Sequence, residues 1–150
     1  MARPTTEPIG LQLGRTAKLV NRAFDDALSE AGGSLPVWQV LLSLKAQPQG
    51  MQRSLASAVG IEGPTLTHHL NRMEEGGLVV RSRDPDNRRV QRAALTEAGE
   101  ALFHSLRQAV IAFDRRLRAG LSASELATLS SLLERLQHNV ENPATNKPGA

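Results

Sequence analysis

The stretch that decides the fold is residues 61–96, which reads IEGPTLTHHLNRMEEGGLVVRSRDPDNRRVQRAALT. Its first part predicts a helix over residues 64–75. Pro64 suits the first helical turn, where the backbone N–H that proline lacks would have no partner. Leu66, Leu70 and Met73 are spaced four and three residues apart, so they share one face of that helix. We expect this face to be buried and Gly76-Gly77 to end the helix.

The other side of this predicted helix carries polar groups that can reach DNA bases and phosphates. Glu75 lies there too, near the predicted end of the helix. Taken alone, an ordinary amphipathic surface helix explains the same pattern equally well. Under the functional interpretation the candidate DNA-binding residues of the helix are Pro64, Thr65, Thr67, His68, Asn71 and Arg72.

A β-hairpin is predicted directly after the two glycines. Residues 78–83 are rich in strand-forming side chains, residues 84–87 (DPDN) are typical of a turn, and residues 88–95 form the expected second strand. The sequence therefore predicts a helix followed by a hairpin, which correspond to the recognition helix and the wing of a winged helix-turn-helix.

The hairpin is strongly basic. Residues 81–92 contain five arginines and two aspartates, a local excess of +3 that equals the net charge of the whole chain. Guanidinium groups on an exposed turn suit the narrow minor groove, where the negative potential of DNA is concentrated. A solvated turn whose arginines only aid solubility is the less favoured alternative beside such a helix. The candidate DNA-binding residues of the wing are Arg81, Arg83, Arg88 and Arg89.

A second helix completes the motif on the N-terminal side. Residues 52–60 (QRSLASAVG) form a short helical run that ends at Gly60, a few residues before Pro64. Two helices joined by a short turn with a glycine make a helix-turn-helix. At this point the chain resembles the MarR family of bacterial transcription regulators. The resemblance rests on the Leu55-Ala56 helix, the run PTLTHHLNRMEEGGLVVR at 64–81, the Asp/Arg-rich wing and the LTEAG run at 95–99. It covers about residues 9–140 and is strongest over 52–99.

The resemblance implies a homodimer on a roughly palindromic, inverted-repeat operator, usually a repressor that a small ligand or chemical signal releases. Pro64, Thr65 and His68 match recognition-helix positions that touch DNA in the family, and Arg89 matches the wing-tip arginine that enters the minor groove. The family usually has an aspartate two residues before that arginine, where it braces the arginine by a salt bridge. This chain has Asn87 there, so we expect its wing to be braced differently or less firmly.

The dimer geometry implied by the resemblance assigns roles to these side chains. Recognition helices of such dimers enter successive major grooves about 34–36 Å apart. Arg53, Arg72, Arg81 and the wing would contact phosphates and make the affinity depend on salt. Thr65, Thr67, His68 and Asn71 would read bases, and Arg89 would read the shape of the minor groove.

The flanking segments predict helices that join two copies of the chain. Apolar residues recur every three to four positions over residues 9–31, and Pro36 starts a further helix with a buried stripe of Val37, Val40, Leu41 and Leu44. A capping box, Ser122 to Glu125, starts the last helix. We expect the apolar faces of these helices to form more apolar surface than one chain can cover. This favours an obligate dimer over a self-contained bundle. The candidate dimerisation residues are Leu13, Val20, Phe103, Leu106, Val110, Phe113, Leu117, Leu129, Leu133 and Leu136.

The sequence thus predicts a mainly α protein with a small β-hairpin wing, folded as one domain over residues 1–150. The DNA-binding region would span about 34–96 and the dimerisation helices about 9–32 and 97–140. The tail 141–150 should be disordered, because Pro143 and Pro148 interrupt regular structure near the end of the chain. With 150 residues and 40% hydrophobic content, a sizeable core is feasible.

Several classes of function are excluded or disfavoured. Because the chain has no cysteine, disulfides, thiolate metal sites and thiol-based redox sensing are ruled out. No phosphate-binding glycine loop, nucleophile elbow or pair of catalytic acids is present, so we expect no enzyme and no cofactor. No apolar run is long enough to span a bilayer, and residues 1–10 do not resemble a signal peptide. We therefore expect a cytoplasmic protein without a membrane partner.

Three further hypotheses remain beside the DNA-binding one. A metal site built from His68, His69, His104 and His138 is disfavoured, because neighbouring side chains on a helix point about 100° apart. Trp38 can stack on an aromatic effector, although a core or interface role is more common for an isolated tryptophan. The chain can also be a dimeric protein-interaction module of the same fold, although its arginine-rich wing argues against this.

Overall fold

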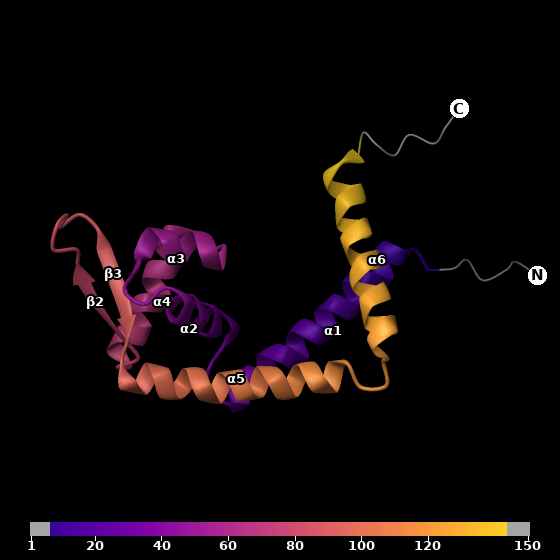
Figure 1. Cartoon of the computed structure of the whole chain (residues 1–150), viewed down its shortest axis with the longest axis horizontal. Helices are drawn as coiled ribbons and strands as arrows, with labels where there is room; N and C mark the ends of the chain where they lie inside the picture. The colour runs from indigo at the N-terminus through magenta and orange to yellow at the C-terminus, as the bar shows by residue number, and fades with distance from the viewer. Residues whose placement is uncertain (1–6, 144–150) are drawn as a thin grey trace, which may run out of the picture. The chain divides into compact units, whose positions relative to one another are not determined.

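The computed structural model describes residues 7–143 and is mainly helical with a small antiparallel sheet (Figure 1). This confirms the predicted fold class. The described chain forms two compact units, residues 7–113 and 114–143, which we treat separately. In chain order the elements are α1 (Ile9–Glu30), α2 (Leu35–Ala46), β1 (Gly50–Met51), α3 (Gln52–Val59), α4 (Gly63–Glu75), β2 (Val79–Arg83), β3 (Gln91–Leu95), α5 (Glu97–Leu117) and α6 (Ala123–Glu141).

The sheet has three strands in the order β1-β3-β2, all antiparallel. In register, Gly50 lies opposite Ala93 and Arg83 lies opposite Gln91. Two details differ from the sequence prediction. The short strand β1 was not predicted, because two residues are too few to show the alternation that marks a strand. The second hairpin strand was also predicted three residues too early.

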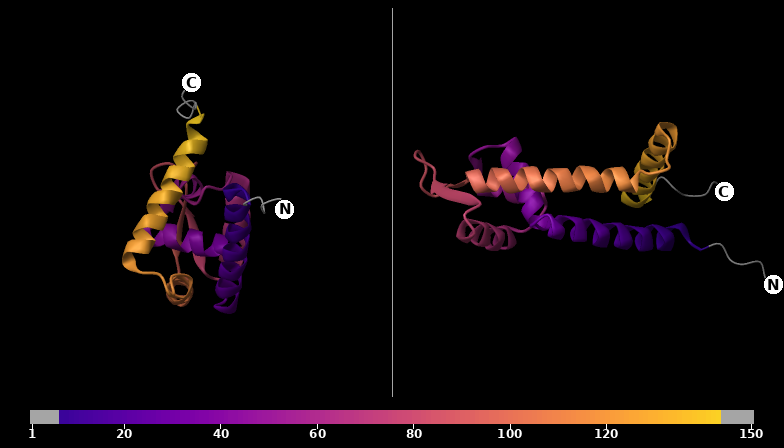
Figure 2. Two further views of the ribbon diagram at one scale, coloured as in Figure 1. Left: turned by 90° about the vertical axis from the view of Figure 1, so that its right-hand side faces the viewer. Right: turned by 90° about the horizontal axis from the view of Figure 1, so that it is seen from below.

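The wing loop continues to residue 90 for a reason visible in its hydrogen bonds. The backbone N–H of Asp84 donates to the carbonyl of Val90 at 2.9 Å, and the N–H of Val90 donates to the carbonyl of Asn87 at 2.9 Å. These bonds close the loop on itself, so Arg88 and Arg89 belong to the turn and not to β3. The hairpin projects from one end of the first unit in the views of Figures 1 and 2.

The core of the first unit lies where the helix-turn-helix packs on the sheet and on α5. Leu66, Leu70 and Met73 of α4 are buried as predicted. In α2 the predicted stripe is largely confirmed, but Trp38 is buried and Val37 only partly so. The other buried apolar residues are Leu28, Val40, Leu41, Leu44, Leu55, Val79, Ala93, Phe103 and Leu106.

The junction between β3 and α5 explains the LTEAG run at 95–99. The hydroxyl of Thr96 accepts a hydrogen bond from the backbone N–H of Gly99 at 3.0 Å and donates one to the carbonyl of Gly77. It therefore caps the start of α5 and holds it beside the end of α4. Gly99 packs so closely that a Cβ there would lie 2.1 Å from the carbonyl oxygen of Leu78. This position accepts only glycine without a shift of the backbone.

The second unit contains the end of α5 and all of α6. The predicted capping box is present: Ser122 Oγ accepts from the N–H of Glu125 at 3.1 Å, and the Glu125 carboxylate accepts from the N–H of Ser122. No side chain of α6 is buried. Glu141 is the last residue of α6, and residues 144–150 of the predicted disordered tail lie outside the described residues. Among the described helices, none has the length and apolar character needed to cross a membrane.

Candidate nucleic-acid interface

The exposed face of α4 is fixed by the burial of its opposite face. With Leu66, Leu70 and Met73 in the core, Thr65, His68 and Arg72 are exposed. The helix starts after Glu62 with proline in its first turn. The turn before it is short because Gly60 ends α3 in the left-handed conformation, with φ of 73°, which glycine adopts without steric cost. Proline and glycine thus set the angle at which α4 is presented.

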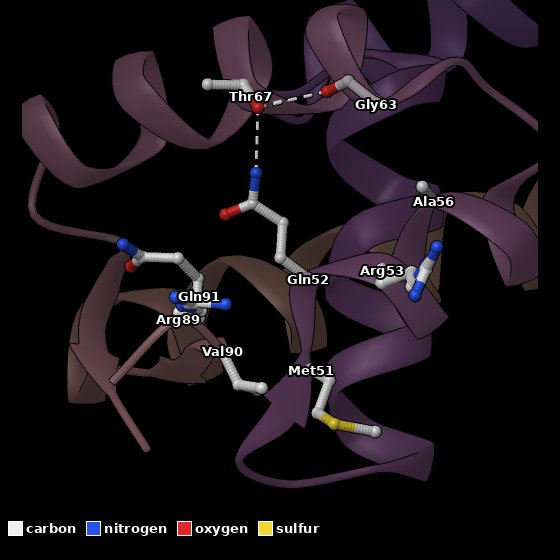
Figure 3. Close-up of a pocket in the computed structure, with 9 residues that line it drawn as sticks. All are labelled: Met51, Gln52, Arg53, Ala56, Gly63, Thr67, Arg89, Val90 and Gln91. Atoms are coloured by element: carbon white, nitrogen blue, oxygen red, sulfur yellow. Dashed lines mark hydrogen bonds between the residues drawn. The ribbon is translucent and has the colours of Figure 1, made fainter. Parts of the chain in front are cut away.

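A side-chain hydrogen bond joins the two helices of the helix-turn-helix. Gln52, the first residue of α3, donates from Nε2 to the hydroxyl oxygen of Thr67 at 2.7 Å. The Thr67 hydroxyl in turn donates to the carbonyl of Gly63 at 3.0 Å. Figure 3 shows this relay between α3 and α4. Sequence reasoning did not identify Gln52, because nothing in the sequence marks a contact between residues fifteen positions apart.

A second set of bonds joins α4 to the first strand of the wing. Arg81 on β2 pairs with Glu74, with 3.2 Å between Nη2 and Oε1, and Nη2 also donates to Asn71 Oδ1. The backbone N–H of Arg81 donates to Glu74 Oε2 at 3.0 Å. The side-chain bond from Arg81, and next the bond from its backbone N–H, lower the pKa of Glu74 below its ordinary 4.5. Sequence reasoning missed Glu74 because it treated Arg81 only as a DNA contact.

The wing is held by a third set of bonds, centred on the buried carboxylate of Asp84. Arg92 Nε donates to Asp84 Oδ2 at 2.6 Å, and the N–H groups of Asp86 and Asn87 donate to Oδ1 at 2.8 and 3.1 Å. The Arg92 bond, and next the Asp86 N–H, lower the pKa of Asp84. Arg92 also donates to the carbonyl of Gln49 at 2.9 Å. The wing is therefore braced differently from the arrangement usual in the family, in which an aspartate stands at the position of Asn87. In this chain Asp84 and Arg92 hold the base of the wing.

Asn87 itself orders the tip of the wing. Its Oδ1 accepts from the backbone N–H of Arg89 at 3.2 Å, so it shapes the turn without pairing with a guanidinium group. Arg83, Arg88 and Arg89 are exposed, and within residues 7–143 their side chains form no ion pair. The wing therefore presents uncompensated positive charge to its surroundings.

An open hollow of about 760 Å³ lies between the helix-turn-helix and the wing. Arg53 on α3 and Arg89 on the wing lie on different sides of it (Figure 3). Its remaining lining comes from Met51, Gln52, Ala56, Gly63, Thr67, Val90 and Gln91. Guanidinium groups on two sides of an open hollow can contact and neutralise the phosphates of a nucleic-acid backbone.

The remaining predicted site residues are Trp38 and the ten candidate dimerisation residues. Trp38 is only 9% exposed and stacks on Phe103 at 5.4 Å between ring centroids, the core role that its sequence context favoured over ligand contact. Phe103 and Leu106 are buried within a single chain, so they cannot offer a free surface to a partner. Four of the predicted dimerisation residues are exposed, namely Leu13, Leu117, Leu129 and Leu133, and four are half-buried, namely Val20, Val110, Phe113 and Leu136.

The histidines do not form a metal site in the described part of the chain. No group of three or more His, Cys, Asp or Glu side chains is placed to hold an ion there. The rings of His68 and His69 lie 5.9 Å apart, edge to face.

Comparison with known proteins agrees with this geometry. Residues 34–91 match the sequence profile of the MarR family. The chain is similar to a structure of the transcriptional repressor CouR bound to a 23-mer DNA duplex, with a TM-score of 0.78 and 29% identity over 87% of this chain and 93% of that chain. It is also similar to a cysteine-to-serine mutant of MarR from E. coli complexed with operator DNA, with a TM-score of 0.76 and 25% identity over 87% of this chain and 94% of that chain.

A third similar structure contains a small molecule. The PcaV transcriptional regulator from Streptomyces coelicolor, in complex with its natural ligand, has a TM-score of 0.72 and 25% identity over 93% of this chain and 99% of that chain. The profile match, these similar structures and the described helix-turn-helix with its basic wing agree. Residues 34–91 thus match the MarR family of winged helix-turn-helix, DNA-binding transcription regulators, and the chain has the fold of its members.

Proposed function

We propose that the protein is a homodimeric repressor that binds an inverted-repeat operator. The observation that carries this proposal is the pairing, on one unit, of an exposed polar face of α4 with a braced wing. On this wing the side chains of Arg83, Arg88 and Arg89 form no ion pair within residues 7–143. An α-helix fits the major groove, and arginine side chains suit the narrow minor groove beside it. Each chain would thus read one half-site with two elements.

Within this proposal the arginines have separate roles. Arg53, Arg83 and Arg88 would contact phosphates, since exposed guanidinium groups neutralise backbone charge without sequence preference. Arg89 would enter the minor groove from the tip of the wing. Such contacts predict affinity that falls steeply as salt concentration rises.

The dimer is supported by apolar surface that the single chain leaves uncovered. In α1, Ile9 and Leu13 lie four residues apart on one face and are 60% and 41% exposed. In α6, Leu129 is 47% and Leu133 is 38% exposed, and no residue of the helix is buried. Contiguous apolar stripes on helices usually mark an interface, and a two-fold dimer covers the same surface on both copies.

The proposal includes repression of transcription and its release by a small molecule. They are supported by similar proteins: CouR is a transcriptional repressor, and PcaV was crystallised with its natural ligand. A ligand would act by binding one conformation of the dimer more tightly than another, where the two conformations differ in the spacing between the winged helix-turn-helix units. We place this activity in the cytoplasm, where a bacterial operator is accessible.

Two measurements test the proposal. Gel-shift titration of the purified protein against DNA from upstream of its own gene should give a saturable complex, and unrelated DNA of equal length should not compete. Sedimentation equilibrium at micromolar concentration should give a dimer. A monomer, or equal binding to every duplex, would contradict the proposal and favour a protein-interaction role for the fold.

A further inference from the structure

We propose that the polar residues of α4 divide into two classes: Thr67 and Asn71 position the helix, whereas Thr65, His68 and Arg72 read the bases. On this assignment each half-site contains a guanine contacted by Arg72, which replaces the phosphate contact expected for Arg72 from the sequence. This inference rests on the proposed function and specifies which base edges the helix recognises.

Thr67 is already committed to its own chain. Its hydroxyl accepts from Gln52 at 2.7 Å and donates to the carbonyl of Gly63 at 3.0 Å. A hydroxyl has one hydrogen to donate, so no donor remains for a base. Breaking the relay to free it would also loosen α3 from α4.

Asn71 is committed in a way that removes its usual base preference. Asparagine recognises adenine through both ends of its amide, accepting from N6 and donating to N7. Here Oδ1 already accepts from Arg81 Nη2. Turning the amide over would place its NH2 against a guanidinium group, donor against donor, so this orientation is fixed. A bidentate adenine contact would have to share Oδ1 with Arg81 and keep the amide in the orientation that Arg81 sets, so it competes with the bond that joins α4 to β2.

Arg81 belongs with the positioning residues. Its side chain is 19% exposed and is held by Glu74 through its Nε and Nη2 atoms. Its Nε and Nη2 atoms are bonded to Glu74 and Asn71 of α4, so a phosphate could reach this guanidinium group only through Nη1 without displacing those bonds. We therefore assign Arg81 to fixing the angle between α4 and β2, and not to the phosphate contact expected from the sequence.

Thr65, His68 and Arg72 are free and lie on one stripe. They are three and four residues apart and all exposed. Within residues 7–143 their side chains make no hydrogen bond or ion pair; His68 only touches the ring of His69. At 1.5 Å per residue, positions 65 and 72 are about 10 Å apart along the helix, which matches roughly three base pairs at 3.4 Å each.

The chemistry of the stripe favours purines, and guanine above all. Arginine donates two parallel N–H groups, and guanine is the base whose major-groove edge presents two acceptors, N7 and O6. A histidine N–H can donate to a purine N7, and the Thr65 methyl group can contact a thymine methyl. The three residues together therefore recognise a short element with guanine opposite Arg72.

Selection from a random duplex library, read by sequencing, separates the two classes. Arg72→Ala and His68→Ala should each lose the preference at one position of the half-site and keep it elsewhere. Thr67→Val and Asn71→Ala should bind more weakly while keeping the wild-type preference at every position. Gln52→Ala should behave like Thr67→Val, because it removes the same bond. Altered preference in Thr67→Val or Asn71→Ala, or unaltered preference in Arg72→Ala, would overturn the assignment.

A chemical substitution tests the guanine directly. In the selected duplex, 7-deazaguanine lacks the N7 acceptor. Placed at the contacted position, it should weaken DNA binding by the wild type roughly 5-fold or more, because a complete bidentate base contact is worth about 5- to 150-fold in affinity. It should leave Arg72→Ala unchanged, while Arg107→Ala on α5 should respond like the wild type. Equal effects on the wild type and Arg72→Ala would refute the inference. If the wild type selects no sequence at all, the proposed function itself fails.

Discussion

Asp84 and Arg92 form an ion pair across the base of the wing, with 2.6 Å between the carboxylate Oδ2 and Nε. Asp84 is the buried charged residue of the described core, at 8% exposure. Its other oxygen accepts two backbone N–H groups of the turn. One carboxylate therefore fixes both the strand that returns from the wing and the turn that carries Arg88 and Arg89.

Removing this carboxylate should loosen the wing. Asp84→Asn keeps the size of the side chain but loses the charge that Arg92 pairs with, so we expect a lower unfolding temperature and weaker operator binding. The double variant with Arg92→Leu should lose less than the sum of the single variants, since residues in contact do not act independently. Additive losses in thermal unfolding would show that the pair does not act as a unit.

The same pair predicts how stability depends on pH. The pKa of Asp84 is lowered from its ordinary 3.8, mainly by Arg92, and that of Glu74 is lowered from 4.5, mainly by Arg81. Each folded carboxylate binds its proton less tightly than the unfolded one. Their stabilising contribution is therefore complete above the ordinary values and is lost as pH falls below them through the folded pKa. Unfolding temperatures of the wild type and Asp84→Asn should converge as pH falls below 4; a gap that stays constant would contradict this account.

Arg89→Ala tests the wing tip. We expect operator binding to weaken by roughly 1–3 kcal/mol and the slope of log affinity against log salt to fall by about one unit. Arg107→Ala removes the same charge away from the wing and should leave both quantities unchanged. Binding by Arg89→Ala that matches the wild type across a salt titration would reject the minor-groove assignment.

Two glycine substitutions of equal size should have opposite effects. Gly99→Ala places a Cβ against the Leu78 carbonyl and should destabilise the fold by about 1–3 kcal/mol, as overpacking does. Gly14→Ala in α1 meets nothing within 4 Å and should stabilise the chain by about 0.5–1 kcal/mol, because alanine is the better helix former. Chemical denaturation measures both; a neutral Gly99→Ala would show that the α5 junction yields easily.

The apolar stripe of α6 can be tested by one charge. Leu133→Glu should shift the sedimentation equilibrium from dimer toward monomer, because it places a carboxylate in the proposed interface. Ser131→Glu adds the same charge to an exposed position outside the stripe and should remain dimeric. If both variants stay dimeric at low micromolar concentration, α6 does not form the interface.

The sequence predicted those features that depend on local patterns. The buried face of α4, the capping box at Ser122 and the hairpin all follow from spacing and turn residues, and the structure confirms them. The bonds that give the interface its shape were not predicted. Gln52 with Thr67, Glu74 with Arg81 and Asp84 with Arg92 join different elements, so they exist only after those elements pack.

The same limit explains why the division of α4 into positioning and reading residues was not visible in the sequence. Thr65 and Thr67 look alike there, as do Asn71 and Arg72, because all four are polar residues outside the buried stripe. Only the neighbouring α3 and β2 distinguish them, by bonding to Thr67 and Asn71.

We propose that two copies of the chain bind one duplex, each through α4 and its wing. Sedimentation velocity of a labelled duplex taken from the library selection tests it most directly, because it gives both the stoichiometry and the affinity. We predict two chains per duplex, with affinity roughly a thousandfold or more above that for a scrambled duplex. One chain per duplex, or equal affinity for the selected and scrambled sequences, would contradict the account.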